Sequence, residues 1–453
     1  MNWHATLTAM LPEHLLLVGI VLLTLIEITS RRSSGALTVS VAAVAAAALA
    51  AVVLAVSGYS AAPFAGHFSV SPTTLAAKAI VLALTLPVLL MAREDFAEDG
   101  QFHLLVLSSL YGTSLLLSAD SFLTLFLGLE LMSLPVYALV VLGFRRPESA
   151  EAALKYLVLG GAATATFLMG VSLLFGASGT LALAEFAKAL GSNDLLAQAA
   201  VVLIIVSFFL KAAVVPFHTW APDAYEGASI PVTAYMAVVI KAGVLLAAVR
   251  LFAQAALSPT MVGLLAILPL ASMVWGNLTA MRQWSFRRMI AYSSIAHAGY
   301  LFYAFLGEGS TRFTAVVFYV LAYGVMNLLA FASLPRAHDD AAQDSLENMR
   351  GMFQRDPFAA VMIGLAMLSL AGIPPLPGFV AKFLIFKNVI AAGYTLYAVL
   401  GLIGSYLGIY FYLRVIQYMF MGAREPAAEV ALVRRAALGA SVLCLFPAVL
   451  VSV

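Results

Sequence analysis

Charged residues and cysteine are both scarce in this chain. Of its 453 residues, 63% are hydrophobic and only 10% are Asp, Glu, Lys or Arg. A soluble domain of this length needs far more charge to keep its surface hydrated. The lone cysteine, Cys444, excludes a disulfide framework and any cysteine-based metal or iron–sulfur site. The net charge of +2 is too small to indicate a nucleic-acid partner.

The hydrophobic residues form long runs along the whole chain. Runs of about 18 or more apolar residues match a hydrocarbon layer roughly 30 Å thick. The first run lacks a basic segment in front of it, so we interpret it as a retained helix and not as a cleaved signal peptide. We predict an all-α polytopic membrane protein with fourteen transmembrane helices, at residues 13–29, 36–57, 72–92, 102–119, 121–143, 153–176, 198–218, 229–253, 260–281, 288–306, 312–334, 357–391, 395–421 and 430–452.

Prolines predict a break in two of these helices. The twelfth contains Pro374 and Pro375, and the seventh contains Pro216. Proline removes a backbone donor and clashes with the preceding turn, so each helix should consist of two halves joined by an unwound segment. A lysine lies near each break: Lys211 five residues before Pro216, and Lys382 five residues after Pro377.

The spacing of ionisable residues indicates an internal repeat. Glu130 and Lys211 are 81 residues apart, and His297 and Lys382 are 85 residues apart. We predict a single membrane domain with N-terminal helices at 1–100, repeats at 102–253 and 260–421, and a final helix at 430–453. Each repeat has five helices, and this odd number gives the two repeats opposite orientations in the membrane.

The distribution of Lys and Arg between loops predicts the orientation. Positive charges favour cytoplasmic loops. The loops after even-numbered helices hold only Lys188, Arg250 and Arg312. The loops after odd-numbered helices hold Arg31, Arg32, Arg93, Arg145, Arg146, Arg282, Arg287, Arg288, Arg336, Arg350, Arg355, Arg424, Arg434 and Arg435. This excess predicts that both termini face outward, on the periplasmic side.

Five ionisable side chains lie inside predicted spans, and we interpret them as a proton path: Glu130, Lys211, Lys241, His297 and Lys382. A charged side chain in the middle of a membrane costs free energy, and such side chains usually serve a function. Burial favours a neutral lysine and a nearby carboxylate favours a charged one, so their balance makes proton exchange feasible. Histidine titrates near neutrality. The simpler interpretations are a hydrogen-bonded core histidine and static ion pairs.

For the other basic residues within the spans, a purely structural interpretation has at least as much support as a role in proton transfer. Lys78 and Lys387 have stems long enough to reach a headgroup. Lys155 follows Glu151 by four residues, the spacing of a surface helix pair. Arg414 can be structural.

Four motifs resemble the antiporter-like subunits of respiratory complex I. They are LGLELMSLPVYAL at 127–139, FLKAAVVPFHTWAPDAYEG at 209–227, RMIAYSSIAHAGY at 288–300 and GIPPLPGFVAK at 372–382. The resemblance covers nearly the whole chain. Tyr225-Glu226-Gly227 and the absence of a long extra C-terminal helix look most like the subunit N branch of the bacterial enzymes.

This resemblance implies a role for each site residue. Glu130 matches the modulating carboxylate and Lys211 its partner lysine. Lys241 and His297 match a central relay, and Lys382 matches the lysine of the second broken helix.

The resemblance also implies further candidates and the setting in which the chain works. Lys155 and Glu151 match charged positions near the cytoplasmic end of the sixth helix, and His218 lies in the second motif. NAD, FMN, iron–sulfur clusters and quinone would belong to partner chains, with no cofactor or metal here. The expected partners are other complex I membrane subunits, further antiporter-like subunits among them, in a bacterial inner membrane.

Two other interpretations remain open. One is a subunit of a multisubunit sodium–proton antiporter or of a membrane-bound hydrogenase, since these share the scaffold. The other is a structural membrane scaffold whose buried charges only hold helices together.

Overall fold

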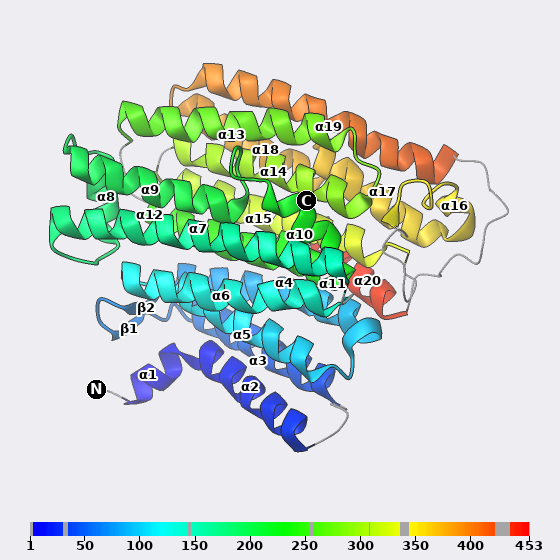
Figure 1. The fold of residues 1–453 in the computed structure, drawn as a ribbon, viewed down its shortest axis with the longest axis horizontal. Helices are drawn as coiled ribbons and strands as arrows, with labels where there is room; N and C mark the ends of the chain where they lie inside the picture. The colour runs from blue at the N-terminus through cyan, green and yellow to red at the C-terminus, as the bar shows by residue number, and fades with distance from the viewer. Residues whose placement is uncertain are drawn as a thin grey trace.

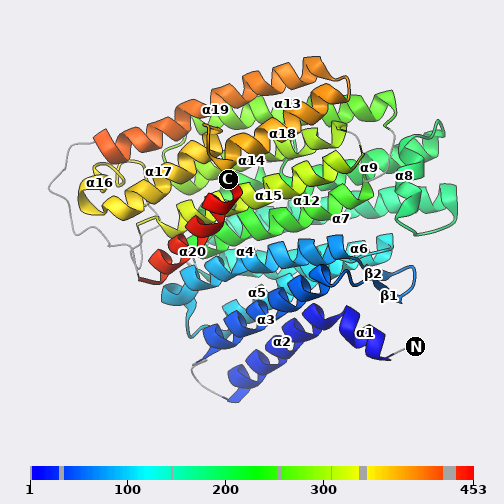
Figure 2. The same ribbon diagram turned by 180° about the vertical axis from the view of Figure 1, so that it is seen from behind.

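The computed structural model describes residues 3–29, 35–143, 146–252, 257–307, 309–335, 344–421 and 435–452. Its long helices run nearly parallel to one another in a broad bundle (Figure 1). The N-terminal helices form one edge of the bundle, and α13 and α19 lie at the opposite edge (Figures 1 and 2). The short helix α8 and the β-hairpin lie at one end of the bundle, and α16 lies at the other end.

The first half of the chain contains the following elements: α1 (Trp3–Ala9), α2 (Leu11–Thr29), α3 (Ala36–Val56), β1 (Ala61–Phe64), β2 (Phe68–Val70), α4 (Pro72–Phe96), α5 (Gly100–Leu117), α6 (Phe122–Leu142), α7 (Pro147–Ser178), α8 (Ala184–Leu190), α9 (Leu195–Ala212) and α10 (Trp220–Gly227). The second half contains α11 (Ile230–Tyr235), the π-helical turn η1 (Met236–Ile240), α12 (Lys241–Leu251), α13 (Pro259–Ala280), α14 (Phe286–Tyr303), the 3₁₀ turn η2 (Ala304–Leu306), α15 (Gly309–Ala332), α16 (Met352–Arg355), α17 (Pro357–Ala371), α18 (Pro377–Ala391), α19 (Thr395–Met421) and α20 (Arg435–Ser452).

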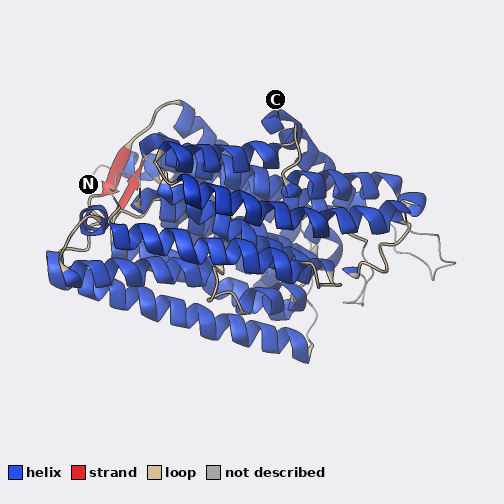
Figure 3. Ribbon diagram, turned by 90° about the horizontal axis from the view of Figure 1, so that it is seen from above, coloured by secondary structure: helices blue, strands red, loops and turns tan. Residues whose placement is uncertain are grey.

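The predicted membrane-spanning helices are present. Within the described ranges, twelve helices are long and apolar enough to cross a membrane. The two other predicted spans correspond to α17 with α18, and to α20. The last helix, α20, returns to pack against α4 and α15, as seen from behind in Figure 2. The antiparallel hairpin of β1 and β2 is a small departure from the all-α prediction (Figure 3).

Both predicted helix breaks are observed. Helix α9 ends at Ala212, Ala213 adopts a left-handed conformation, and α10 begins only at Trp220. In the later helix, α17 ends at Ala371 and the left-handed Gly372 turns the chain away, with φ of +87°. Glycine adopts such a φ without steric cost. Irregular backbone at membrane depth must be satisfied by protein or water, so these breaks place polar backbone groups inside the bundle.

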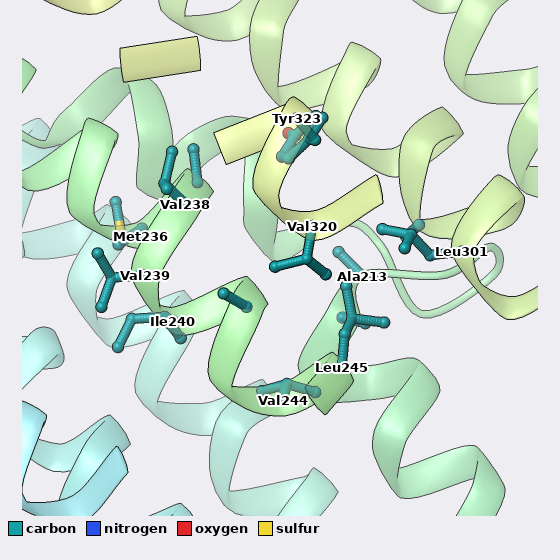
Figure 4. Packing of buried hydrophobic residues seen from close by; sticks show 14 of the residues in the cluster. Ala213, Met236, Val238, Val239, Ile240, Val244, Leu245, Leu301, Val320 and Tyr323 are labelled. Carbon is teal, nitrogen blue, oxygen red and sulfur yellow. The ribbon is translucent and has the colours of Figure 1, made fainter. Parts of the chain in front are cut away.

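The central span contains an irregularity that the sequence did not predict. The π-helical turn η1 separates α11 from α12, immediately before Lys241. Single π turns inside helices often occur at functional sites. Figure 4 shows Val238 and Ile240 of η1 within the buried core, together with Val320 of α15.

Two arginines counted with the outer loops lie in helices, near the ends of the spans predicted at 229–253 and 312–334. Arg312 is buried within α15 and donates to the carbonyl oxygens of Gly307 and Phe252. Arg250 lies in the last turn of α12 and donates to the carbonyl oxygen of Leu117 at 2.5 Å. A guanidinium can replace its water shell with carbonyl oxygens at helix ends, which hydropathy does not reveal. Six arginines used for the orientation lie outside the described residues: Arg31, Arg32, Arg145, Arg336, Arg424 and Arg434.

Candidate functional site

Glu130 and Lys211 form a partly buried ion pair between α6 and α9. The Nζ atom of Lys211 lies 3.2 Å from Oε1 of Glu130 and 3.3 Å from the hydroxyl of Ser133. Thr164 of α7 donates its hydroxyl hydrogen to the same carboxylate oxygen. A cavity of about 10 Å³ lies against Glu130, Thr164 and Lys211, which is room for about one water molecule. The pair is thus held by three helices.

The break after Lys211 is closed by side chains that satisfy its backbone. The indole Nε1 of Trp220 donates to the carbonyl oxygen of Leu210 at 3.0 Å. The backbone N–H of Val215 donates to the hydroxyl of Ser272 at 2.7 Å. The ring of Trp220 stacks on Tyr156 with centroids 4.3 Å apart. These contacts fix the end of α9, and therefore the position of Lys211.

Lys241 is buried in the centre of the bundle and points to α14. Its ammonium group donates to the carbonyl oxygen of Ser294 at 2.7 Å, and also to the hydroxyl of Ser294. That hydroxyl is 3.3 Å from the hydroxyl of Tyr225 on α10. Lys241 therefore connects α12 to α14 through neutral oxygens, and no carboxylate pairs with it among the described residues.

His297 is bonded through both ring nitrogens. Its Nε2 lies 3.0 Å from the hydroxyl of Tyr412, and its Nδ1 lies 2.8 Å from the hydroxyl of Tyr319. The hydroxyl of Tyr412 also lies 2.5 Å from that of Ser293. A chain of exchangeable hydrogens thus runs from Ser293 through Tyr412 to His297. This geometry is that of the hydrogen-bonded core histidine of the simpler interpretation, and it is also the geometry that a proton relay requires.

Lys382 lies on α18, across the second break. Its Nζ donates to the carbonyl oxygens of Leu370 and Ala371 at 3.0 and 3.1 Å, and it lies 5.1 Å from the ring centroid of Tyr300. A half-open pocket of about 450 Å³ between α18 and α19 reaches Lys382. The ammonium group of Lys382 thus lies at the C-terminal end of α17, where the helix carbonyls concentrate negative potential and favour a positive charge.

These five residues form three local groups. Glu130 and Lys211 touch directly. Lys241 reaches Ser294, the neighbour of Ser293, and Ser293 leads through Tyr412 to His297. The ring of Tyr300 then lies between His297 and Lys382, 5.5 Å from the imidazole centroid. Within the described part of the chain, no hydrogen bond joins Lys211 to Lys241.

Several members of this array were not found from the sequence. Ser293 and Ser294 lie inside the motif at 288–300, four and three residues before His297 respectively, on the adjoining turn of the helix. Tyr412 belongs to α19 and carries no signal of its own, because tyrosine is common in membrane helices. Only the fold brings it to the imidazole.

A charged network occupies the end of the bundle where α7, α10 and α14 meet. Lys155 pairs with Glu151 and with Asp223, each at 2.7 Å. Arg288 pairs with Asp223 at 2.8 Å and with Glu226 at 2.9 Å. The Lys155 side chain is 45% exposed, so each pair contributes little stability on its own. The predicted surface pair exists, but it belongs to a larger network that links the two predicted repeats.

His218 lies apart from the lysines, in the unwound segment between α9 and α10. Its Nε2 accepts a hydrogen bond from the indole of Trp275 at 3.0 Å. Arg414 donates to the carbonyl oxygens of Met281 and Gln283, and its guanidinium lies 5.5 Å from the ring centroid of Trp284. Both contacts hold loops and helix ends together. No group of three or more His, Cys, Asp or Glu side chains is placed to hold a metal ion in the ranges described.

The interpretation of Lys78 as a residue that reaches the headgroups is wrong. Its side chain is fully buried, and its Nζ lies 2.5 Å from Oε1 of Glu13, which is also buried. Lys387, in contrast, is exposed on α18, as predicted. Glu13 escaped the sequence analysis because it stands at the first residue of its predicted span, where a carboxylate is ordinary.

Comparison with known proteins gives consistent matches. The family described as NADH:quinone oxidoreductase/Mrp antiporter, TM, matches residues 119–408. The chain is 39% identical to the NADH-quinone oxidoreductase subunit N of Pelobacter propionicus, over 93% of this chain and 91% of the relative. It is 33% identical to that of Laribacter hongkongensis, over 95% of this chain and 91% of the relative.

Solved structures show the same fold. A chain of respiratory complex I from Thermus thermophilus is 33% identical, with a TM-score of 0.83 and 97% coverage of both chains. A chain of the Mrp complex from a Dietzia species is 24% identical, with a TM-score of 0.80 and coverage of 94% of this chain and 82% of the other. At that identity the second match establishes the architecture alone.

Proposed function

We propose a function from the premise that this chain belongs to the NADH:quinone oxidoreductase/Mrp antiporter family of membrane subunits: it carries protons across a membrane as one subunit of a proton-translocating NADH–quinone oxidoreductase. The observation that carries this proposal is the array of buried groups from Glu130 to Lys382. Ionisable side chains inside a membrane bundle mark ion pathways. Here they alternate with hydroxyl groups that exchange hydrogens with them.

Each group has a distinct part in the proposed transfer. Glu130 holds a proton on Lys211 while the two are in contact, and separation of the pair favours release of that proton. Lys241 takes up a proton and passes it by way of Ser294 towards His297. Histidine exchanges protons through both nitrogens, so the bonds to Tyr412 and Tyr319 let it transmit one without leaving its place. Lys382 receives the proton at the second break.

The two helix breaks give these groups their settings. Unwound backbone and half-helix ends in a bundle surround ion sites in transport proteins. Lys211 lies in the last turn of α9, and Lys382 bonds the last carbonyls of α17. In the proposed division, residues 102–253 and 260–421 form two inverted repeats, each with one break and one lysine at it.

The electron chemistry belongs to partner chains in this proposal. NAD, FMN, iron–sulfur clusters and quinone act in other subunits, and motion in neighbouring membrane subunits drives the proton steps. The partners include further antiporter-like subunits. The complex lies in a bacterial inner membrane, with both termini of this chain outside and the Lys155–Asp223 network at the cytoplasmic face.

The test is NADH-driven acidification of inverted membrane vesicles from a Lys211→Ala strain, measured beside native-gel levels of the assembled complex. Lys188→Ala, which removes an exposed lysine from α8, is the matched control. We expect acidification to collapse for Lys211→Ala while assembly and the control remain normal. Normal acidification with normal assembly would overturn the proposal. Loss of assembly with intact acidification per complex would support a scaffold, and stimulation by sodium would support an antiporter.

A further inference from the structure

A second buried ion pair lies outside the array described above. Glu13 lies in the first turn of the bundle's edge helix α2, and Lys78 lies in the second turn of α4. Their charged atoms are 2.5 Å apart, and their side chains are 1% and 0% exposed. Removing two charges from water costs several kcal/mol each, so such a pair is a weak source of stability. Its presence in a proton-conducting fold calls for another explanation.

The pair is poorly satisfied by hydrogen bonds. The second carboxylate oxygen of Glu13, Oε2, has no hydrogen-bond partner among the described residues. The hydroxyls of Ser114 on α5 and of Ser118, the residue just after α5, are buried and also lack partners within the described chain. They follow Tyr111 by three and seven residues, a spacing that places all three on one side of the helix. Helix α5 packs against α2, the helix that carries Glu13, so these hydroxyls lie on a direct neighbour of the pair.

A small apolar cap separates the pair from the end of the bundle. The cap consists of Ala9, Leu54, Phe68, Val70 and Leu75, which form a buried cluster apart from the main core. The ring of Phe68 belongs to the cap and also lies over Lys78, with Nζ 4.9 Å from its centroid. The cap is built from α1, the end of α3, the hairpin and the start of α4, all at the end opposite α16 (Figure 1).

The pair is linked to the central array by α12. This helix begins with Lys241 and has Arg250 in its last turn. These two residues are roughly 13 Å apart along the axis at 1.5 Å per residue. The guanidinium of Arg250 is fixed to the carbonyl oxygen of Leu117 at 2.5 Å, and α12 packs against both α4 and α5. A permanent positive charge thus lies where α12 meets α5, beside the helix that carries Lys78.

We propose that Glu13 and Lys78 form a second proton-exchanging pair, closed towards the outer face by the Phe68 cap, through which protons leave the chain. This inference rests on the proposed proton-translocating function. The first step transfers one proton from the ammonium of Lys78 to the carboxylate of Glu13. It breaks one N–H bond, forms one O–H bond and converts an ion pair into a neutral amine and a carboxylic acid.

The later steps follow from the same geometry. A neutral pair suits a low-dielectric site better than two charges. Movement of Phe68 then admits water, and the Glu13 acid releases its proton outward. Lys78 is recharged by a proton from the array, which restores the ion pair and its attraction to the Phe68 ring.

The first experiment measures proton translocation per assembled complex in inverted vesicles carrying Glu13→Gln. The matched control is Glu185→Gln, which breaks the exposed Lys188–Glu185 pair. We expect a several-fold loss for Glu13→Gln and none for the control. Native translocation by an assembled Glu13→Gln complex overturns the inference. If Lys211→Ala loses translocation in the same assay while Glu13→Gln does not, only this inference fails; if both are native, the proposed function fails with it.

The second experiment takes its main measurement from native complex and uses two variants for comparison. Carbodiimides react with a protonated carboxyl and not with a carboxylate, so dicyclohexylcarbodiimide reports the neutral state of Glu13. We expect the peptide that contains Glu13 to be labelled during NADH oxidation, as read by mass spectrometry, and labelled faster in Phe68→Ala. A static ion pair gives no label in native complex, while Lys78→Met, which leaves the carboxyl unpaired, is labelled. That pattern overturns the inference.

Discussion

Lys211 lies before the break in its helix, whereas Lys382 lies after the break in its own. Lys211 is in the last turn of α9 and faces the carboxylate of Glu130. Lys382 is on α18 and reaches back to the last carbonyls of α17. One lysine therefore has a charged partner that can move away, and the other has backbone dipoles that cannot. The two should respond differently to substitution.

Two substitutions of Lys382 distinguish the effect of its positive charge from its ability to release a proton. Lys382→Arg keeps donors for the carbonyls of Leu370 and Ala371 but fixes the positive charge, because a guanidinium does not lose its proton in proteins. We expect normal assembly without proton translocation. Lys382→Met leaves both carbonyls without a donor and should cost about 1–3 kcal/mol of stability. Native-gel levels and vesicle acidification distinguish the two variants, and normal translocation by Lys382→Arg would contradict the role given to this residue.

Glu130→Gln is expected to slow translocation while the chain still folds. The amide keeps an acceptor for the Thr164 hydroxyl but removes the charge that holds a proton on Lys211. Loss of a charged hydrogen bond costs about 1.5–3 kcal/mol, which corresponds to roughly 10- to 100-fold in rate. Acidification rates of vesicles, normalised to assembled complex, measure this. Glu148→Gln, at the start of α7, serves as the control, and equal rates for both variants would argue against the pair.

Tyr412→Phe removes one hydroxyl and leaves the ring packing unchanged. The hydroxyl lies between Ser293 and His297, so its loss breaks the only hydrogen-bonded link seen between them in the described chain. We expect a translocation rate lower by about tenfold, for a lost hydrogen bond worth about 1.4 kcal/mol. Tyr410→Phe, at an exposed tyrosine of the same helix, should have no effect. An unchanged rate for Tyr412→Phe would exclude this relay.

The architecture is readable from the sequence because the membrane imposes it locally. Each span must satisfy its own backbone hydrogen bonds, so an apolar run becomes a helix whatever its neighbours are. The same reasoning locates the breaks, since Pro216, Pro374 and Pro375 act within a few residues of themselves. Lys211 and Lys382 stand out for the same local reason, as charges inside apolar runs.

The partners of these charges are not readable in this way. Lys78 was expected to reach a headgroup, but Glu13, 65 residues earlier, meets it inside the bundle. A lysine that reaches the headgroups and a lysine that pairs inside the bundle can have the same local sequence. Only the packing of the helices decides which of the two occurs. Tyr412 is brought to His297 by packing as well. The π-helical turn before Lys241 contains no proline or glycine, so its sequence does not predict it.

Gly378 is the residue on which the second break most depends. A Cβ atom at this position would lie 1.8 Å from the carbonyl oxygen of Ser369 and 2.6 Å from its carbon, so backbone would have to move. The amide of Gly378 also donates to the Ser369 hydroxyl at 3.0 Å. Alanine should therefore push α18 away from α17 and separate Lys382 from the carbonyls it bonds.

We expect Gly378→Ala to cost about 3 kcal/mol, at the upper end of overpacking effects, and to lower translocation per complex as well. Gly161→Ala is the control, because a Cβ there meets nothing within 4 Å and the substitution should be neutral or stabilising. Thermal unfolding of purified complex and vesicle acidification measure the two effects. If Gly378→Ala lowers stability but leaves translocation per complex intact, the contact of Lys382 with α17 holds the helices together without serving the proton path.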